Sequence, residues 1–378
     1  MARRRFLPII CRAFTKDILM MTGFVLIALV ALFAFFDVMG RIGGRYSITQ
    51  IFVMTALAIP TRVYEIMPIA VLLASVFVMS KWAARNEFTV LRVGGLSSMR
   101  LAKFLMVPGL ILVAFTYLFG EFISPMSEAQ YREFHIQARY GTIRLNSNRT
   151  GTWVREVDER LAGRTIRYIN IKSMNEKGSA NGWRVFEFSS DGSLSRIIRA
   201  KSGRYVGSQG WLLRGVEESR LPRVAFDKET FNSQQVQFRN VPNMTLGSSI
   251  SPEIFSLMLM RPERMSMKAL SSYISHLKQS RQQYKSYEIG FWNKVFYPIA
   301  ILVMMALSMP FAYLSPRNGS MSIKIFAGLM LGLGFYTINN LFSYIGMINT
   351  WPALVVALVP SVFMLAIAVA AMAFVERR

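Results

Sequence analysis

Six long apolar stretches divide the chain, and the residues between them are mostly polar or basic. The stretches cover approximately residues 17–38, 51–81, 101–122, 291–314, 323–344 and 352–374. The hydrocarbon core of a bilayer is about 30 Å thick, and a helix that crosses it needs about 20 mainly apolar residues. The pattern therefore predicts six transmembrane helices. The first is expected to be retained, because no small-residue cleavage site follows it.

A different pattern fills the chain between the third and fourth stretches. From about residue 142 to residue 241, short strand-like runs alternate with turn residues such as Asn181-Gly182. Short strands at roughly regular spacing with such turns are typical of an all-β sandwich or jelly roll. Residues 251–286 then show apolar positions at helical spacing and lead back to the membrane.

These patterns together predict an α-helical membrane protein with six transmembrane helices and an inserted, all-β, jelly-roll-like domain. We expect residues 1–125 to hold the first three spans, with a short cytoplasmic helix at about residues 83–94. Residues 126–265 should form the β domain with its connecting segments. Residues 266–378 should hold a connecting helix and the last three spans.

The distribution of the positive charge predicts the orientation of these spans. The formal net charge is +23, and basic residues lie before the first span, after the sixth, and in the second-to-third and fourth-to-fifth connections. With six spans, all of these segments lie on one side. The positive-inside rule then places both termini in the cytoplasm and the β domain outside it. Arg41 and Arg45, between the first two spans, break this rule.

Composition also excludes several kinds of site. The single cysteine, Cys11, allows no intrachain disulfide, and the two histidines, His135 and His276, have no metal-ligand spacing. The chain contains no G-x-x-x-x-G-K-[ST] phosphate loop, so it has no recognisable means of hydrolysing ATP. The basic residues are dispersed and no nucleic-acid motif is visible, so we expect no nucleic acid as a partner.

Basic side chains also gather at the expected outer ends of the first three spans. They are Arg41, Arg45, Arg62, Arg132, His135 and Arg139. Arginine binds phosphate bidentately and keeps its charge, so this cluster predicts a site for a phosphorylated lipid headgroup. The alternative is that these residues anchor helices at the interface or pair with acidic neighbours such as Asp37, Glu65 and Glu121.

The connection between the second and third spans carries a candidate docking helix. Residues 81–95 have the pattern of a short amphipathic helix that ends at Gly94, since glycine is a natural residue at that position. Such a helix docks into a groove of a cytoplasmic partner or simply joins the two spans, and its position alone does not decide between these.

The fifth span contains an unusual group of polar residues. They are Asn339, Asn340, Ser343 and Tyr344. Polar side chains within a span usually face other helices or a cavity, and the sequence leaves both possibilities open.

Three motifs follow one another along the chain. The first is Arg85-Asn86-Glu87 with Val90 and Gly94-Gly95, the second is Gly120-Glu121 with Pro125 and Ala138-Arg139-Tyr140-Gly141, and the third is Trp292-Asn293-Lys294-Val295-Phe296-Tyr297-Pro298 followed by Met304-Met305-Ala306-Leu307. In this order they resemble the lipopolysaccharide export permeases, the LptF/LptG family. The resemblance covers essentially the whole chain, and the third motif is more similar to the LptG branch than to the LptF branch.

The resemblance implies a permease subunit, which is not itself an enzyme, of an ATP-driven ABC transporter in the bacterial inner membrane. Such a transporter extracts lipopolysaccharide and passes it to a periplasmic bridge of β-jelly-roll domains. The implied partners are an LptF-type paralogue, an LptB-type ATPase dimer, an LptC-type single-span protein, an LptA-type bridge and lipopolysaccharide. ATP and Mg²⁺ would bind to the ATPase, and no cofactor or metal is expected in this chain.

The resemblance also assigns roles to individual residues. It implies an ATPase-coupling helix formed by Arg85, Asn86, Glu87, Phe88, Leu91 and Gly94. In this helix Glu87 is the acidic residue that sits in the ATPase groove. It further implies lipopolysaccharide-binding candidates at Asp37, Arg41, Arg45, Arg62, Arg132, His135 and Arg139. Gly40 and Thr61 stand where the family has basic residues, so the cluster is thinner here, and the charge of His135 depends on pH.

Two other function classes fit parts of the same pattern. A membrane-anchored periplasmic sensor or scaffold would have this architecture without a coupling helix or an ATPase partner. A secondary transporter would show repeated halves and ionisable residues at mid-membrane, and the last three spans have almost none. An LptF-type subunit would leave the class of function unchanged.

Overall fold

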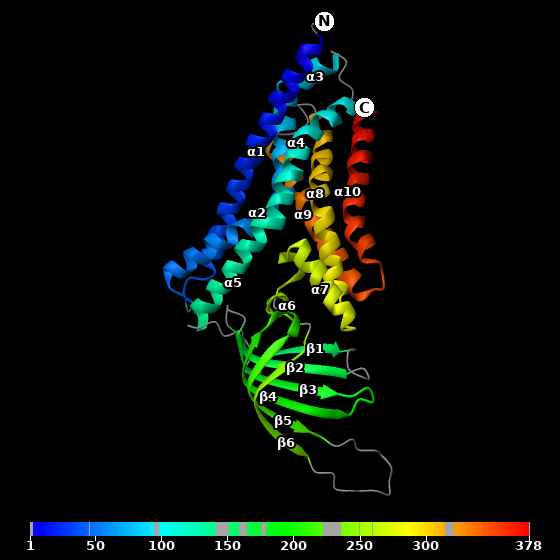
Figure 1. Ribbon diagram of the computed structural model, residues 1–378. Helices are drawn as coiled ribbons and strands as arrows, with labels where there is room; N and C mark the ends of the chain where they lie inside the picture. The colour runs from blue at the N-terminus through cyan, green and yellow to red at the C-terminus, as the bar shows by residue number, and fades with distance from the viewer. Residues whose placement is uncertain are drawn as a thin grey trace. The chain divides into compact units, whose positions relative to one another are not determined.

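A computed structural model of the chain describes residues 3–44, 46–93, 98–140, 151–158, 165–174, 179–221, 236–248, 250–258, 260–313 and 321–377. The chain divides into two compact units. The first comprises residues 1–131, 262–271 and 285–378, and the second comprises residues 132–261 and 272–284. Figure 1 traces the chain through both units.

The first unit is a bundle of long apolar helices (Figure 1). Its main elements are α1 (Arg3–Met39), α2 (Ile48–Ala84), α3 (Glu87–Val93), α4 (Ser98–Leu118), the π-helix η1 (Phe119–Ile123), α8 (Lys285–Ser308), α9 (Met321–Ile348) and α10 (Ala353–Glu376). α4, η1 and most of α5 (Ser124–Tyr140) make one continuous span. Six stretches of the described chain are long and apolar enough to cross a membrane, which confirms the predicted number.

α2 lies at the centre of this bundle. It packs against α1, α8 and α9, and 72% of its most apolar stretch is buried, compared with 11% for α1. A capping box fixes its start, because the Ser47 hydroxyl accepts from the Gln50 N–H and the Gln50 side chain accepts from the Ser47 N–H. α1 instead turns Phe24, Ile27 and Phe36 outward. An apolar outer face of this kind suits lipid or another membrane helix.

The second unit contains an antiparallel sheet. Its strands are β1 (Thr152–Asp158), β2 (Thr165–Met174), β3 (Ser179–Phe188), β4 (Leu194–Tyr205), β5 (Trp211–Arg220) and β6 (Gln237–Leu246). The order of the strands in the sheet follows their order in the chain. This confirms the inserted all-β domain, and the described strands form a meander in which the Greek-key connections of a jelly roll do not occur.

Two buried tryptophans organise the core of the sheet. Trp183 on β3 and Trp211 on β5 have ring centroids 4.8 Å apart. Their indole N–H groups donate to the carbonyls of Ala180 and Ile250, so neither ring carries an unsatisfied donor into the core. Gly203 on β4 makes room for this arrangement, since a Cβ atom there would lie 2.7 Å from Nε1 of Trp183.

The segment that returns the chain to the membrane is helical, as its spacing predicted, but it is interrupted. It contains α6 (Pro252–Met258), the 3-10 turn η3 (Pro262–Arg264) and α7 (Met267–Gln279). Leu270, Tyr273 and Leu277 of α7 are buried. His276, on the same helix, is also buried, and its Nε2 atom has no hydrogen-bond partner among the described residues. Burial lowers the pKa of the His276 imidazole.

Candidate functional site

Arg62 forms ion pairs with two acidic residues of the same chain. Its guanidinium lies 3.0 Å from a carboxylate oxygen of Glu65 on α2 and 3.6 Å from one of Asp37 on α1. The alternative interpretation of the basic cluster, as partners of acidic residues, therefore describes Arg62 correctly. The same contacts bring Asp37 and Arg62 together, as two of the predicted site residues.

Arg41 has a different environment, although it follows α1 by only two residues. Its Nη2 donates to the Tyr131 hydroxyl at 3.1 Å, its guanidinium carbon lies 5.6 Å from the centre of the Tyr131 ring, and its Nη1 faces the Met54 sulfur at 3.5 Å. No carboxylate of the described chain lies within ion-pair distance of Arg41. A fixed guanidinium with neutral partners keeps its full positive charge and spare N–H donors for an anion.

The structure describes the remaining headgroup candidates only in part. Arg45 lies outside the described residues. Arg132, His135 and Arg139 lie on α5, in the second unit, with Arg132 and His135 half-buried. The side chain of Arg139 is outside the described part. Their roles stay predictions from the resemblance.

A short helix, α3, lies within the predicted range of about 83–94 and begins at Glu87, immediately after a tight turn. Asn86 in this turn has φ +57°, a left-handed conformation that asparagine tolerates better than most residues. Arg85 reaches Glu87 at 3.7 Å, and both side chains are at least one-third exposed. The side chain of Leu91 and all of Gly94 are outside the described residues.

Phe88 of α3 is buried against the bundle. Its ring centroid lies 6.3 Å from that of Phe14 on α1 and 6.0 Å from that of Trp82 on α2, and Phe14 and Trp82 are 5.1 Å apart. The Trp82 indole N–H donates to Asp17 of α1 at 3.1 Å. We call Phe14, Trp82 and Phe88 the aromatic clasp. Because Phe88 packs inside its own chain, it is not available to a partner.

The outward face of α3 carries two valines that are not among the predicted site residues. Val90 is 71% exposed and Val93 is 87% exposed. They are three residues apart and therefore lie on one face of the helix. This spacing was the only signal in the sequence that could have identified them.

A cavity of about 330 Å³ lies between α2, α8 and α9. The four polar residues of the fifth span, Asn339, Asn340, Ser343 and Tyr344, all line it. Ser343 also accepts a hydrogen bond from the Asn293 side chain at 3.1 Å, so part of this group holds helices together while facing the cavity. These residues therefore face a cavity, and one of them also contacts another helix.

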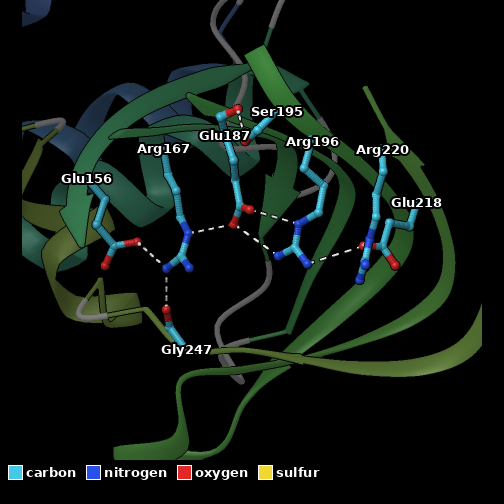
Figure 2. A network of polar contacts seen from close by, with 8 residues as sticks. All are labelled: Glu156, Arg167, Glu187, Ser195, Arg196, Glu218, Arg220 and Gly247. Atoms are coloured by element: carbon cyan, nitrogen blue, oxygen red, sulfur yellow. Dashed lines mark hydrogen bonds and ion pairs between the residues drawn. The ribbon is translucent and has the colours of Figure 1, made fainter. Parts of the chain in front are cut away.

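A ladder of alternating charges crosses the inner face of the sheet (Figure 2). Its members, in order, are Glu156, Arg167, Glu187, Arg196, Glu218 and Arg220, joined by ion pairs of 3.9, 2.7, 2.8, 3.3 and 2.7 Å. Arg167 also donates to the Gly247 carbonyl at 2.7 Å. The members from Glu156 to Arg196 are direct cross-strand partners, because each follows the previous one in register on β1 to β4.

The ladder is joined throughout by ion pairs, and it is largely buried. Glu156, Arg167, Glu187 and Glu218 are at most 6% exposed. Burial raises the pKa of the Glu218 carboxyl, but the hydrogen bonds and positive charges of Arg220 and Arg196 outweigh burial and hold that pKa below its ordinary value. Three acidic and three basic side chains alternate along the ladder, so each ion pair joins groups of opposite sign.

Comparison with known proteins places the chain in a family. The family described as lipopolysaccharide export system permease LptF/LptG matches residues 9–373. The chain belongs to the LptF/LptG family. Among its relatives, lipopolysaccharide export system permease protein LptG of Escherichia coli (strain K12) is 27% identical over 346 residues, 91% of each chain. The LptG protein of Haemophilus influenzae is 26% identical over 338 residues, 89% of each chain.

Membership of the LptF/LptG family fits the architecture described above. Permeases of the lipopolysaccharide export system are membrane proteins, and this chain has six helices suited to crossing a bilayer. The helices and the LptG relatives together indicate a multi-pass protein of the inner membrane. Membership also confirms the resemblance that the three sequence motifs suggested.

Proposed function

We propose that this chain is the LptG-type permease subunit of an ATP-driven ABC transporter that extracts lipopolysaccharide from the inner membrane. In this proposal an LptF-type paralogue completes the membrane part, and an LptB-type ATPase dimer binds ATP and Mg²⁺ in the cytoplasm. LptC-type and LptA-type proteins carry the lipid across the periplasm. The single observation that carries the proposal is the geometry of α3, which is fixed to the bundle on one side and exposed on the other.

The exposed side of α3 is suited to a groove in a partner protein. Val90 and Val93 offer an apolar surface, and Glu87 offers a carboxylate at the start of the same helix. An amphipathic helix that lays its apolar face into a groove is a common mode of recognition. Two exposed valines on a helix of seven residues are more stable when a partner covers them.

The buried side of α3 gives the partner a way to move the membrane helices. Through the aromatic clasp, Phe88 contacts α1 and α2 at once, and Asp17 of α1 accepts from the Trp82 side chain. A movement of α3 therefore pulls on two spans together. We propose this contact as the mechanical link between ATP hydrolysis in the partner and the movement of the membrane helices that expels the lipid.

Arg41 is the residue that we propose for the lipid headgroup. Lipopolysaccharide carries phosphate groups, and a guanidinium without a carboxylate partner binds phosphate more readily than one already in an ion pair, such as Arg62. This role requires the ends of α1 and α2 near Arg41 to face the periplasm. The positive-inside rule supports that orientation, with both termini in the cytoplasm and the β domain in the periplasm.

The charged ladder bears on the route of the lipid. Acyl chains need an apolar surface, and the described inner face of this sheet carries ion-paired acidic and basic side chains across five strands. Displacing that network would expose charges to hydrocarbon at a high cost. We therefore infer that the acyl chains travel through β domains of the partner proteins, while the sheet of this chain has a structural or assembly role.

Association with the ATPase tests this proposal. Charge reversal by Glu87→Lys, or a new charge by Val90→Asp, is expected to reduce copurification of the ATPase with the permease pair. Glu217→Lys is a matched control, because it is the same reversal at an exposed position of β5. If the Glu87→Lys complex purifies intact and transports normally, α3 is not the coupling helix. If the unmodified chain purifies with no ATPase, the sensor or scaffold alternative is favoured.

A further inference from the structure

Lys294 is a buried cation that forms no ion pair with a carboxylate of the described chain. It lies on α8 and is 7% exposed. Its Nζ donates to the Gly120 carbonyl at 3.0 Å and lies 5.5 Å from the centre of the Tyr64 ring. Within the described chain no carboxylate oxygen lies within 4.0 Å of it, and Glu121 instead accepts from the backbone N–H groups of Met267 and Lys268. An ammonium group has three N–H donors, so two remain unused.

The contact with Gly120 has a local structural cause. Gly120 lies in the π-helix η1, where the regular hydrogen-bond ladder of the span is interrupted and a carbonyl becomes available to a side chain. A Cβ atom at this position would lie 2.2 Å from the Tyr64 ring, so only glycine allows this approach. Lys294 thus holds the bulge, but this role uses one donor and gives the ammonium group no ion pair.

Lys294 also lines the cavity between α2, α8 and α9. The cavity volume, about 330 Å³, falls at the lower end of the range of about 300–1,000 Å³ that is usual for small-ligand sites. Besides Lys294, its wall carries the hydroxyl of Tyr64 and the amides of Asn339 and Asn340. Two carboxylates, Glu65 and Glu263, also face it, and Glu65 is already paired with Arg62.

The position of the cavity in the bundle narrows the choice of ligand. It is lined by the first half of α8 and the second half of α9, at the opposite end of the bundle from α3 (Figure 1). Ile69, Phe335 and Met347 supply apolar surface in the same wall. A cation without an ion pair, uncharged hydrogen-bonding groups and apolar surface together suit the headgroup of a lipid rather than a free ion or a purely apolar molecule.

We propose that this cavity binds an anionic lipid headgroup that also bears hydroxyl groups, with the anion at Lys294 and the hydroxyls at Asn339, Asn340 and Glu65. A sugar phosphate of lipopolysaccharide and the glycerol phosphate of phosphatidylglycerol share this chemistry. The inference rests on the proposed function in that it places the cavity at the periplasmic side. It adds a second headgroup contact, distinct from Arg41.

Photo-crosslinking in the assembled complex tests this site. A photoreactive amino acid at position 340 should capture a lipid in membranes that contain both lipopolysaccharide and phosphatidylglycerol, and the mass of the adduct identifies which one. In this background, Lys294→Gln keeps a donor for Gly120 but removes the charge, and it should reduce the adduct by about tenfold or more. Lys294→Arg should retain it. Asn339→Leu, which leaves Lys294 in place, should also reduce it.

Position 341 provides the matched control. Leu341 is 52% exposed, lies on the same helix and does not line the cavity, so any lipid adduct there should not change with Lys294→Gln. A protein adduct at position 340, no adduct, or a lipid adduct that Lys294→Gln does not change would overturn the inference. Transport measured on the same complex separates the two proposals. Active transport without a headgroup adduct refutes only this site. A Lys294-dependent phosphatidylglycerol adduct in a complex that cannot extract lipopolysaccharide refutes only the proposed function.

Discussion

Removing the Phe88 side chain should release α3 from the bundle without unfolding the spans. The ring is 5% exposed and contacts both Phe14 and Trp82. Replacing a buried phenylalanine by alanine costs about 3–5 kcal/mol. α3 has only seven residues, and a turn of two residues joins it to α2. The lost free energy should therefore weaken the packing of α3 against the bundle and leave α1 and α2 folded. At about 1.4 kcal/mol per tenfold change, even 3 kcal/mol shifts the docking equilibrium by about a hundredfold.

Hydrogen exchange of the isolated permease, without the ATPase, measures this release. In Phe88→Ala, the amides of α3 should lose about a hundredfold of their protection, while those of α2 should not change. Val90→Ala is the matched control, because Val90 is exposed and its truncation should leave the exchange of α3 in the isolated permease unchanged. Equal protection of α3 in Phe88→Ala and in the unmodified chain would show that the aromatic clasp does not hold this helix.

Three further predictions concern the β domain, the connecting helix and the lipid site. Arg167→Met removes the arginine that pairs with buried Glu156 and one of the two arginines that pair with buried Glu187, and it should destabilise the β domain by about 3–5 kcal/mol, measured by chemical unfolding followed by tryptophan fluorescence. His276 is held neutral by burial, so folding stability should be lost as pH falls below about 6.5 toward the lower pKa of the folded state; His276→Leu should flatten the pH dependence of the melting temperature between pH 5 and 7.5. Arg41→Glu should reduce lipopolysaccharide extraction in a reconstituted assay by about tenfold or more, whereas Arg62→Lys, which keeps a charge in a half-exposed ion pair, should change it by less than about twofold. Unchanged extraction in Arg41→Glu would refute the headgroup role.

The architecture could be predicted from the sequence because its signals are local. A run of about 20 apolar residues has one stable arrangement in a bilayer, so hydropathy alone located the six spans. Alternating runs with glycine-containing turns located the sheet at about residues 142–241, and the observed strands run from Thr152 to Leu246.

The details of the site depend on contacts between distant residues, which no local pattern encodes. Phe88 was assigned to the predicted coupling helix, and no local pattern showed that it packs against Phe14. Several acidic residues were possible partners of Arg62 in the sequence, and the structure shows that it pairs with Asp37 and Glu65. The isolated charge of Lys294 likewise follows from where its neighbours lie, because the motif that contains it was recognised without any indication of a cavity.

ATP-driven release of lipopolysaccharide from proteoliposomes tests the central claim most directly. The assay would contain this chain with its LptF-type paralogue, the ATPase and the periplasmic acceptors, and would follow transfer of lipid to the acceptors. We predict transfer that requires ATP and this chain, and that is lost in Glu87→Lys while the permease pair remains assembled. ATP-dependent transfer of equal rate without this chain, or in the Glu87→Lys complex, would contradict the account.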